Sequence, residues 1–238
     1  MTEPTVVAMG GGGFSMEPDN PLLDDHVLYL ARGARGRDRT RVCFLATASG
    51  DSAAYIASFY AAFARRAEAT HLPLFIRAVD DIEAFLLDQD VVYVGGGKTE
   101  NMLAIWRVQG VDRALHRAWE AGIVLTGLSA GSLCWFETGT TDSFGAGLAA
   151  LSSGLGPIQG SHSPHYDGEA SRRPHYHRLV AEGVLPAGYA ADLGAALVFR
   201  DTAIVEAVAS RPEARGYRVE RGPDGEAVET VLPTRYLG

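Results

Sequence analysis

One serine stands in a pattern that suits nucleophilic catalysis. Gly127-Leu128-Ser129-Ala130-Gly131 is a complete G-x-S-x-G sequence; an apolar stretch that predicts a strand precedes it, and a helix-compatible run to residue 136 follows. Small neighbours permit the sharp strand-to-helix turn on which a nucleophile projects from the carboxyl edge of a sheet. The pattern therefore predicts Ser129 as the nucleophile of an acyl transfer, with a plain helix N-cap serine as the alternative.

Backbone amides near this serine could stabilise an oxyanion. Gly95-Gly96-Gly97 ends the preceding predicted strand, and ligands of open sheets bind outside the carboxyl ends of the strands. The amides of this loop are suitable donors, together with the amide of Ala130 directly after the nucleophile. The alternative is that the glycines only serve a tight turn with positive φ.

A serine hydroxyl needs a base, and the histidines offer one. Four of the seven fall in one segment: His162, His165, His175 and His177. His165 stands in a predicted loop, from which an imidazole can reach Ser129. The cluster could instead bind a metal, but its spacing does not match H-E-x-x-H and no cysteine joins it. No metal site is therefore expected.

The third member of a triad is a carboxylate that orients the imidazole. Asp142, Asp192 and Glu137 are the candidates. Glu137 follows one turn of the nucleophile helix and is the weakest of the three.

The elements that must position these residues alternate along the first half of the chain. Apolar runs predict strands at 5–9, 41–46, 71–77, 91–94 and 122–126, and amphipathic segments predict helices at 51–67, 79–87, 99–108 and 111–121. Strands that are apolar throughout and separated by helices are typical of a parallel sheet covered on both faces. We expect an α/β fold with a mostly parallel sheet and one domain spanning residues 1–238.

The second half of the chain is less regular. A stretch rich in Gly, Ser and Thr at 138–160 is followed by a polar segment, a helix ending near 181, and short strands at 195–199, 203–208 and 216–220. The run Gly10–Gly13 could cradle a phosphate. It lacks the G-x-x-x-x-G-K-[ST] layout, which argues against nucleotide binding.

Composition excludes several classes of protein. The net charge of −8 argues against nucleic-acid or anionic-membrane surfaces. The two cysteines, Cys43 and Cys134, form no disulfide framework, which fits a reducing compartment. We see no signal peptide and no apolar run long enough to span a membrane, so a cytoplasmic location is expected.

Together these motifs resemble the peptidase E family, the serine peptidases that include aspartyl dipeptidase and cyanophycinase. The resemblance rests on residues 94–99 with Asn101-Met102-Leu103, on 127–132, and on Pro164-His165-Tyr166. It implies a class I glutamine amidotransferase-like fold and hydrolysis of the bond after an N-terminal aspartate, without a metal or organic cofactor. By this resemblance Ser129 is the nucleophile and His165 the base, while Gly97 and Ala130 offer the oxyanion amides.

The sequence departs from the family pattern at two positions. Lys98 stands where the glycine loop usually continues with Asn. The family's acid aligns with Leu193, one position after Asp192, and a shift of one residue along an extended chain turns a side chain to the opposite face. We expect Asp192 to serve as the acid, with Asp142 or an incomplete triad as the alternatives.

A substrate that begins with aspartate needs a cation for its carboxylate, and Arg binds carboxylates bidentately. Arg172 and Arg173 follow the base closely, and Lys98 adjoins the oxyanion loop. The partner expected is thus a small peptide, and a homodimer is possible. The other functions left open are a catalytically weak family member that binds small molecules or acidic peptides, and an esterase, in which Asp142 would precede the histidine.

Overall fold

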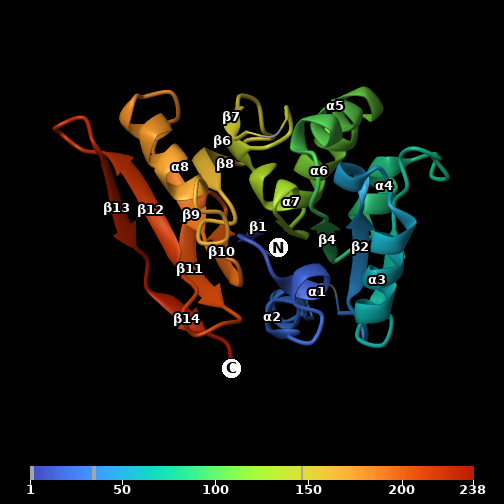
Figure 1. Ribbon diagram of the computed structural model, residues 1–238. Helices are drawn as coiled ribbons and strands as arrows, with labels where there is room; N and C mark the ends of the chain where they lie inside the picture. Colours follow the sequence, from blue (N-terminus) through green and yellow to red (C-terminus); the bar gives the residue numbers. More distant parts are fainter. Residues whose placement is uncertain (1–2, 34–35, 146) are drawn as a thin grey trace.

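The computed structural model describes residues 3–33, 36–145 and 147–238, and its strands form two sheets flanked by helices (Figure 1). The larger sheet has the strand order β14-β11-β10-β1-β5-β4-β2-β3. These strands are β1 (Thr5–Met9), β2 (Arg41–Leu45), β3 (Glu68–His71), β4 (Val91–Val94), β5 (Val124–Leu128), β10 (Ala195–Arg200), β11 (Ala203–Ala209) and β14 (Thr234–Tyr236).

The half of this sheet from β1 to β3 is parallel, while β10 is antiparallel to both β1 and β11. Every residue of β1, β4 and β5 is buried. Apolar side chains on both faces of these strands require cover on both sides, and short helical crossovers provide it.

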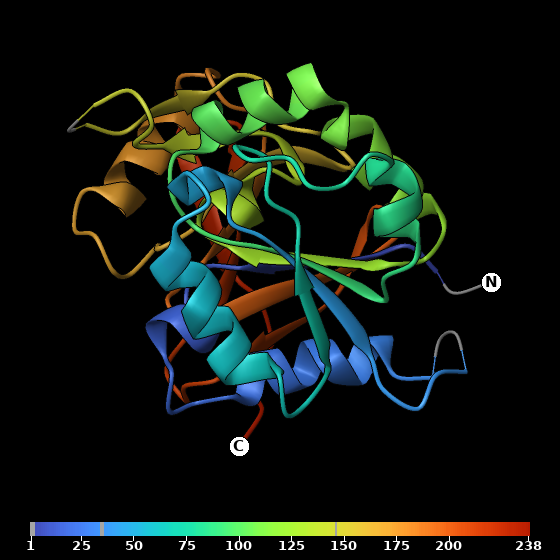
Figure 2. The same ribbon diagram turned by 90° about the vertical axis from the view of Figure 1, so that its right-hand side faces the viewer.

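Helices cover both faces of the large sheet, as Figure 2 shows with the strands between two helical layers. One face is covered by α1 (Gly13–Met16), α2 (Leu22–Ala31) and α3 (Ala53–Phe63), with a core of interlocked aromatic rings that includes Phe14, Phe44 and Phe59. The other face is covered by α4 (Ile82–Leu87), α5 (Thr99–Gln109), α6 (Val111–Glu120) and the short α7 (Ala130–Leu133). A 3₁₀ turn, η1 (Thr47–Ser49), follows β2.

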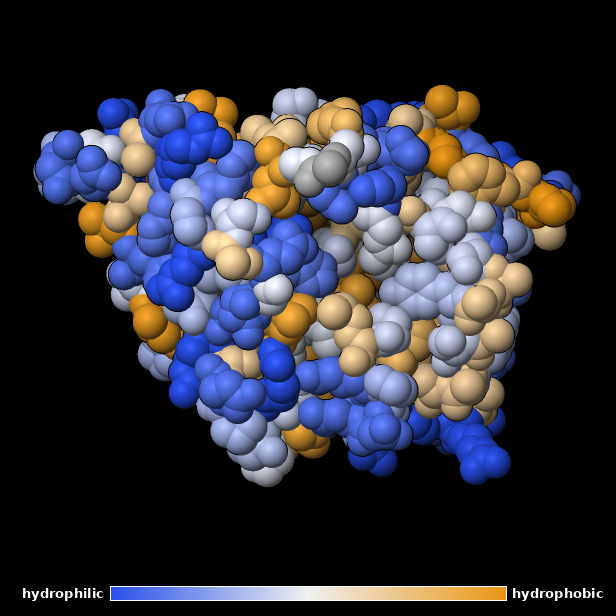
Figure 3. Space-filling view, viewed as in Figure 1, coloured by the Kyte–Doolittle hydropathy of each residue, from blue (hydrophilic) through white to orange (hydrophobic). Residues whose placement is uncertain are grey.

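The second sheet has the order β13-β12-β9-β8-β6-β7. Its strands are β6 (Phe136–Thr141), β7 (Ala149–Leu151), β8 (Ile158–Ser163), β9 (Gly188–Ala191), β12 (Gly216–Arg221) and β13 (Ala227–Val231). Helix α8 (Arg172–Ala181) packs on this sheet, and their shared core includes Tyr166, Tyr176 and Tyr217. In the surface view the residues over α8, β12 and β13 are mainly hydrophilic, whereas apolar residues are commoner over α3 and α4 (Figure 3).

The expected fold class, an α/β sheet flanked by helices, is confirmed, and the predicted strands at 5–9 and 91–94 have the observed limits. One expected strand was wrong: β3 ends at His71, so 72–77 is not a strand. Helix α2 was not predicted, nor were the strands within 138–160, which are most of β6, all of β7 and the start of β8. These strands are polar in sequence because they bury hydroxyl pairs such as Thr140 with Ser163, whose oxygens lie 2.8 Å apart.

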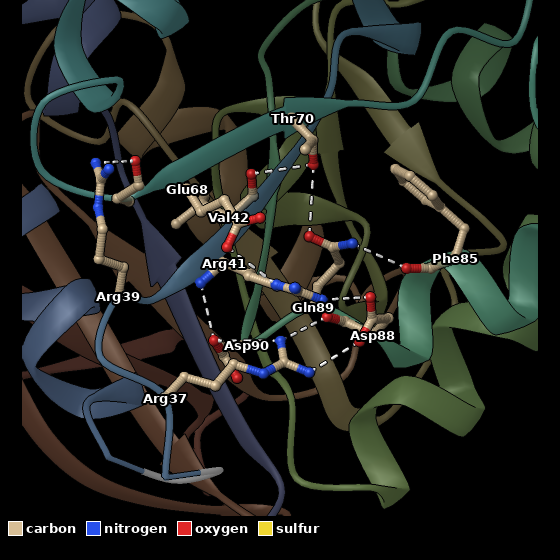
Figure 4. Close-up of polar contacts among 11 residues, drawn as sticks. Arg37, Arg39, Arg41, Val42, Glu68, Thr70, Phe85, Asp88, Gln89 and Asp90 are labelled. Atoms are coloured by element: carbon tan, nitrogen blue, oxygen red, sulfur yellow. Dashed lines mark hydrogen bonds and ion pairs between the residues drawn. The ribbon is translucent and has the colours of Figure 1, made fainter.

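Charged residues gather at the amino ends of β2, β3 and β4. Arg41 pairs with Glu68 at 3.1 Å, Arg37 pairs with Asp88 at 2.8 Å, and the Asp90 carboxylate accepts the Arg41 N–H (Figure 4). Glu68 and Asp88 are exposed, and ion pairs of exposed groups add little stability. Glycine-rich turns occupy the opposite, carboxyl edge of the same sheet. Among the described residues, no helix is both long enough and apolar enough to cross a membrane.

One buried carboxyl couples the stability of this sheet to pH. Asp24 of α2 is 1% exposed and accepts a 3.1 Å hydrogen bond from the Tyr93 hydroxyl. Burial raises the pKa of Asp24 from 3.8 to about 7. The folded state holds this proton more tightly than the unfolded chain does. The contribution of the protonated Asp24 to the free energy of unfolding is therefore complete below pH 4 and is lost as the pH rises through 7.

We therefore expect Asp24→Asn, which keeps an acceptor for Tyr93 but carries no charge, to be more stable than the wild type at pH 8. The expected gain is on the order of 1–4 kcal/mol and narrows toward pH 4. Thermal unfolding followed by circular dichroism from pH 4 to 8 measures it. A difference in Tm that stays constant over this range would contradict the expectation.

Candidate active site

Three turns meet at the carboxyl edge of the central strands. β1 leads into Gly10–Gly13, β4 leads into Gly95–Gly97, and β5 leads into Ser129. β5 lies between β1 and β4, and Met9 pairs with Leu128 in the parallel register, so Gly10 stands beside Ser129. This is the edge at which open α/β sheets bind ligands.

The Ser129 turn is strained and depends on two glycines. Ser129 has φ 56° and ψ −116°, a conformation that L-residues rarely adopt. A Cβ on Gly127 would lie 2.5 Å from the Val94 carbonyl oxygen, and one on Gly131 only 2.1 Å from the same atom. The chain must pass this close to β4 because the turn folds helix α7 back against the end of that strand. Strand β5 and helix α7 thus present a half-buried Ser129 side chain at the edge of the sheet.

The neighbouring glycine loop provides one amide that is already bonded and one that is not. The Gly96 N–H donates to the Tyr55 hydroxyl at 3.1 Å, and a Cβ on Gly96 would lie 3.3 Å from that of Ser129. Gly97 is exposed, has φ 141°, and its N–H forms no hydrogen bond with a described residue. Ala130 is the first residue of α7, so its N–H has no carbonyl partner within the helix. Gly97 and Ala130 thus each have an N–H group without a hydrogen-bond partner among the described residues.

His165 is held at the same edge by its backbone. Its N–H donates to the Gly10 carbonyl at 2.8 Å, and the next N–H, of Tyr166, donates to Ala191 at 3.1 Å. His165 itself has φ 55°, and its Nδ1 would lie 3.2 Å from a Cβ on Gly11. Because Gly10 stands beside Ser129, these bonds place the His165 loop next to the serine turn. The His165 imidazole and the Ser129 hydroxyl form no hydrogen bond with each other.

The surroundings of His165 favour a neutral imidazole. Burial lowers the pKa of His165, and the Arg172 guanidinium lowers it further. The carboxylates of Glu169, Asp142 and Asp167 act in the opposite direction, and the net pKa lies below the ordinary value. A half-buried imidazole that is unprotonated near neutral pH can accept a proton from a hydroxyl.

Asp192 is close to this loop but is bonded elsewhere. Its buried Oδ2 accepts from the Arg215 N–H and from the Tyr217 hydroxyl, both at 2.9 Å, and its Oδ1 has no partner among the described residues. Burial raises the pKa of Asp192. The structure therefore does not bring Asp192 into a hydrogen bond with His165. Leu193 occupies the nearer position, since a Cβ on Gly11 would touch both its side chain and His165 Nδ1.

The two alternative acids have other partners. The Asp142 carboxylate accepts from Lys98 Nζ at 3.0 Å in an exposed pair. The Glu137 carboxylate accepts the Gly160 N–H at 2.7 Å. Neither is hydrogen-bonded to His165, although the charge of Asp142 acts on its pKa.

The three predicted substrate cations are all paired within the chain. Arg172 is 4% exposed and binds Glu169 through two nitrogens at 2.9–3.2 Å. Arg173 binds Glu229 and lies over the rings of Tyr166 and Tyr217. Lys98 pairs with Asp142 and is the most loosely held, because both partners are exposed. A cavity of about 370 Å³ lies between the β6–β7 connection and α8, with Asp142, Glu169 and His175 in its wall.

Sequence patterns missed a second serine–histidine pair. Ser132 Oγ lies 2.6 Å from His162 Nε2, and His162 Nδ1 lies 3.2 Å from the Tyr189 carbonyl. This carbonyl assigns the proton to Nδ1, so Nε2 accepts from Ser132. Both residues are fully buried, and burial lowers the pKa of His162 to about 3. The pair joins α7 to β8 beneath the site. Its only sequence signal is that each residue lies three positions from a predicted catalytic one.

The four clustered histidines do not converge. His177 bonds Glu229 at 2.9 Å and His175 bonds Arg178 at 3.0 Å, away from His162 and His165. Within residues 3–33, 36–145 and 147–238, no group of three or more His, Cys, Asp or Glu side chains is arranged to hold a metal ion.

Close packing accounts for the Gly10–Gly13 run. A Cβ on Gly10 would lie 2.2 Å from the Ala191 carbonyl oxygen, and one on Gly13 would lie 2.5 Å from the Tyr93 hydroxyl. The glycines let the chain after β1 pass between the His165 loop and residues 191–194. This close packing explains the glycine run without a bound phosphate.

The architecture is the class I glutamine amidotransferase-like fold, with a serine in the turn after β5. The family model of peptidase family S51 matches residues 6–207. An uncharacterized peptidase, YgaJ, of Bacillus subtilis (strain 168) is 49% identical over 234 residues, which cover 98% of this chain and 99% of that protein. The chain belongs to peptidase family S51, and this membership makes it a peptidase.

Solved structures share the fold at lower identity. A peptidase from an acI-B1 Actinobacterium superposes with a TM-score of 0.69 at 17% identity, covering 97% of this chain and 95% of that one. A putative peptidase E protein from Listeria monocytogenes EGD-e gives a TM-score of 0.59 at 17% identity, covering 86% and 98%. The expected resemblance to the peptidase E family is thus confirmed.

The serine turn offers a test of its packing. In Gly131→Ala the new methyl group meets the Val94 carbonyl, and overpacking of this kind costs about 1–3 kcal/mol. We expect Tm to fall by about 2–4 °C per kcal/mol. Gly147→Ala is the matched control, since no atom lies within 4 Å of its new Cβ. Equal Tm values for the two variants, measured by calorimetry, would show that the close approach is unimportant.

Proposed function

We propose that this peptidase is a serine enzyme that hydrolyses dipeptides or short peptides with N-terminal aspartate, with Ser129 as nucleophile and His165 as general base. The observation that carries the proposal is the strained Ser129 turn beside Gly10, whose carbonyl holds the backbone of His165. Strain at a residue other than glycine persists only where the surroundings enforce it, and here two glycines packed on Val94 do so.

The steps follow from these positions. His165 takes the Ser129 hydroxyl proton as the oxygen attacks the peptide carbonyl, and the amides of Gly97 and Ala130 receive the oxyanion. The carbon–nitrogen bond breaks, and His165 returns the proton to the leaving amine. A water molecule, deprotonated by His165, then releases the aspartyl group and restores the Ser129 hydroxyl.

The charges around the 370 Å³ cavity suit a short zwitterionic peptide. Asp142 and Glu169 lie in its wall and can hold the substrate's ammonium group. Lys98 can exchange its exposed partner, Asp142, for the substrate's side-chain carboxylate, because an exposed pair of this kind is worth only about 0–1 kcal/mol. Arg172 and Arg173, predicted from sequence for this role, would first have to leave Glu169 and Glu229.

We further propose that Ser129 and His165 act without a carboxylate bonded to the imidazole. Leu193 lies where the acid would stand, and the two hydrogen bonds to Asp192 Oδ2 give that residue a role in joining β9 to β12. The backbone bonds of the His165 loop then hold the residue beside the serine turn, and no carboxylate among the described residues fixes the tautomer of its imidazole.

The test is hydrolysis of Asp-p-nitroanilide and a panel of Asp-X dipeptides by wild type, Ser129→Ala and Asp192→Asn. Ser129→Ala should lose at least about 10³-fold in kcat. Asp192→Asn keeps its acceptor oxygen and should stay within about tenfold of wild type, whereas a triad acid would cost about 10⁴-fold.

Other results have definite meanings. Turnover unaffected by Ser129→Ala would refute the nucleophile. Absence of turnover by the wild type on peptides and on p-nitrophenyl esters would favour the binding-protein alternative. Cleavage of esters alone, lost in Asp142→Asn, would favour the esterase.

The electrostatics of His165 give a pH test. Arg172 lowers the pKa of His165, so Arg172→Gln should raise it and move the acidic limb of kcat/KM to higher pH. Glu169 acts in the opposite direction, so Glu169→Gln should move the limb to lower pH. The two shifts should be opposite in sign. Shifts of the same sign in both variants would contradict the assignment of His165 as the base that titrates on the acidic limb.

A further inference from the structure

Main-chain hydrogen bonds fix the glycine loop after β4 at both of its ends. The Gly95 N–H donates to the Leu45 carbonyl at 3.0 Å, and the Lys98 N–H donates to the Ala48 carbonyl at 2.8 Å. The stretch between these two points is Gly96-Gly97, and glycine leaves a backbone more freedom to rotate than any other residue does. The main-chain bonds therefore leave the Gly96 amide to be oriented by another contact.

A single side-chain hydroxyl provides that contact. The Gly96 N–H donates to the Tyr55 hydroxyl at 3.1 Å, and among the described residues Tyr55 is the only side chain that is hydrogen-bonded to the backbone of this loop. The hydroxyl donates its own proton to Ser15 Oγ at 3.2 Å. Ser15 lies on α1, which follows the Gly10–Gly13 turn. Because β5 lies between β1 and β4, the Tyr55 hydroxyl joins the two turns that flank Ser129.

Aromatic packing holds the Tyr55 ring in place. Tyr55 lies on α3, and its ring centroid is 5.0 Å from that of Phe44 and 5.6 Å from that of Phe14. A Cβ on Gly95 would lie only 2.9 Å from Tyr55 Cε1, so the loop and the ring approach closely. Burial raises the pKa of Tyr55, so the hydroxyl keeps its proton at neutral pH and can donate it to Ser15. The aromatic core, and not the loop, thus sets the position of the hydroxyl.

The Tyr55 bond also determines which amide of the loop is free. A Cβ on Gly96 would lie 3.3 Å from that of Ser129, so Gly96 is the residue of the loop that packs on the serine turn. Its N–H points to Tyr55, whereas the N–H of the exposed Gly97 has no partner among the described residues.

We infer that Tyr55 is a positioning residue for peptide hydrolysis: its hydroxyl holds the Gly96 N–H and thereby directs the Gly97 N–H toward the oxyanion. The inference rests on the proposed function, which assigns the Gly97 amide to the oxyanion. Tyr55 itself contacts neither the substrate nor the nucleophile in this role. Its contribution is to keep a donor fixed before the reaction begins, which is the condition under which such donors are effective.

The substitution Tyr55→Phe tests the role of the hydroxyl, because it keeps the ring and removes one oxygen. Loss of an oxyanion donor costs about 10²–10³-fold in kcat. A donor that is present but no longer held should cost less, about 10- to 100-fold. KM for the same Asp-X dipeptide should stay within about twofold, because the oxyanion forms only in the transition state.

Two further variants serve as controls. Tyr60→Phe is matched, since Tyr60 lies on the same helix and its hydroxyl bonds His71 Nδ1 at 2.8 Å, away from the serine turn. It should keep the wild-type kcat and lose a similar amount in Tm. Ser15→Ala removes the other partner of the Tyr55 hydroxyl but leaves the acceptor for Gly96, so its kcat should lie between those of the wild type and Tyr55→Phe.

A transition-state analogue gives a readout that a loss of stability alone would not change. The boronic acid analogue of aspartate forms a boron–oxygen bond with Ser129 while the hydroxyl proton passes to His165, and the tetrahedral boronate carries the negative charge. Tyr55→Phe should weaken inhibition by this compound by the same factor as it lowers kcat/KM. Tyr60→Phe should leave the inhibition unchanged.

Amide hydrogen exchange tests the orientation of the loop without any substrate. Exchange at Gly96, followed by NMR, should be about fivefold faster in Tyr55→Phe than in the wild type, the effect of one hydrogen bond. Tyr60→Phe should not change it. Equal exchange at Gly96 in all three proteins would overturn the inference, because the Tyr55 hydroxyl would then not hold this amide.

The kinetic outcomes separate the inference from the proposed function. A kcat of Tyr55→Phe within about twofold of that of Tyr60→Phe, with turnover still lost in Ser129→Ala, would overturn the inference and leave the proposed function standing. A rise in KM at constant kcat would also overturn it, since Tyr55 would then act in substrate binding. Turnover that Ser129→Ala leaves unchanged would refute the proposed function itself.

Discussion

The structure depends on backbones that approach one another where only glycine fits. At the carboxyl edge of the large sheet, Gly127 and Gly131 pack on the Val94 carbonyl, and Gly10 packs on the carbonyls of residues 191 and 192. Gly97 packs in the same way on the Ala48 carbonyl, at 2.2 Å from where a Cβ would be. A Cβ at any of these positions would push one of the turns at this edge away from the backbone on which it packs. The serine turn, the oxyanion loop and the His165 loop are thus positioned by main-chain packing rather than by contacts between their side chains.

This mode of construction explains why the site is open. Main-chain contacts fix the backbone of Ser129 and His165, and neither the hydroxyl nor the imidazole has a hydrogen-bond partner among the described residues. The charged side chains around the site form ion pairs with one another: Lys98 with Asp142, Arg172 with Glu169, and Arg173 with Glu229. The exposed pair, Lys98 with Asp142, is the one that a charged substrate displaces at least cost. Arg172, by contrast, is fixed in place and acts on His165 through its charge.

The sequence predicted the first half of the fold well because that half obeys simple rules. Apolar strands such as 91–94 and the turn at Ser129 are local patterns, and helix α5 begins at the expected Thr99. Apart from the strand predicted at 216–220, the second sheet was missed because strands such as β6 and β8 bury hydroxyl groups that bond one another, as Thr140 and Ser163 do. Tyr55, which holds the Gly96 amide from 41 residues away, gives no signal in the sequence at all. Partners chosen by tertiary packing cannot be recognised from spacing alone.

The acid illustrates the same point at the scale of one residue. Asp192 and Leu193 are adjacent in sequence, yet Asp192 turns toward Tyr217 and the Arg215 amide while Leu193 packs beside Gly11 and Gly168. The Leu193 N–H donates to the Asp167 carboxylate at 2.7 Å, and this bond also holds Asp192 and Leu193 in these orientations. Moving Asp192 onto His165 would break two hydrogen bonds at 2.9 Å and expose Leu193. An imidazole that is kept neutral by burial, with its loop bonded to Gly10, can act as a base without such a rearrangement. The hydrogen bonds at this turn therefore fix which of Asp192 and Leu193 lies nearer to the His165 loop.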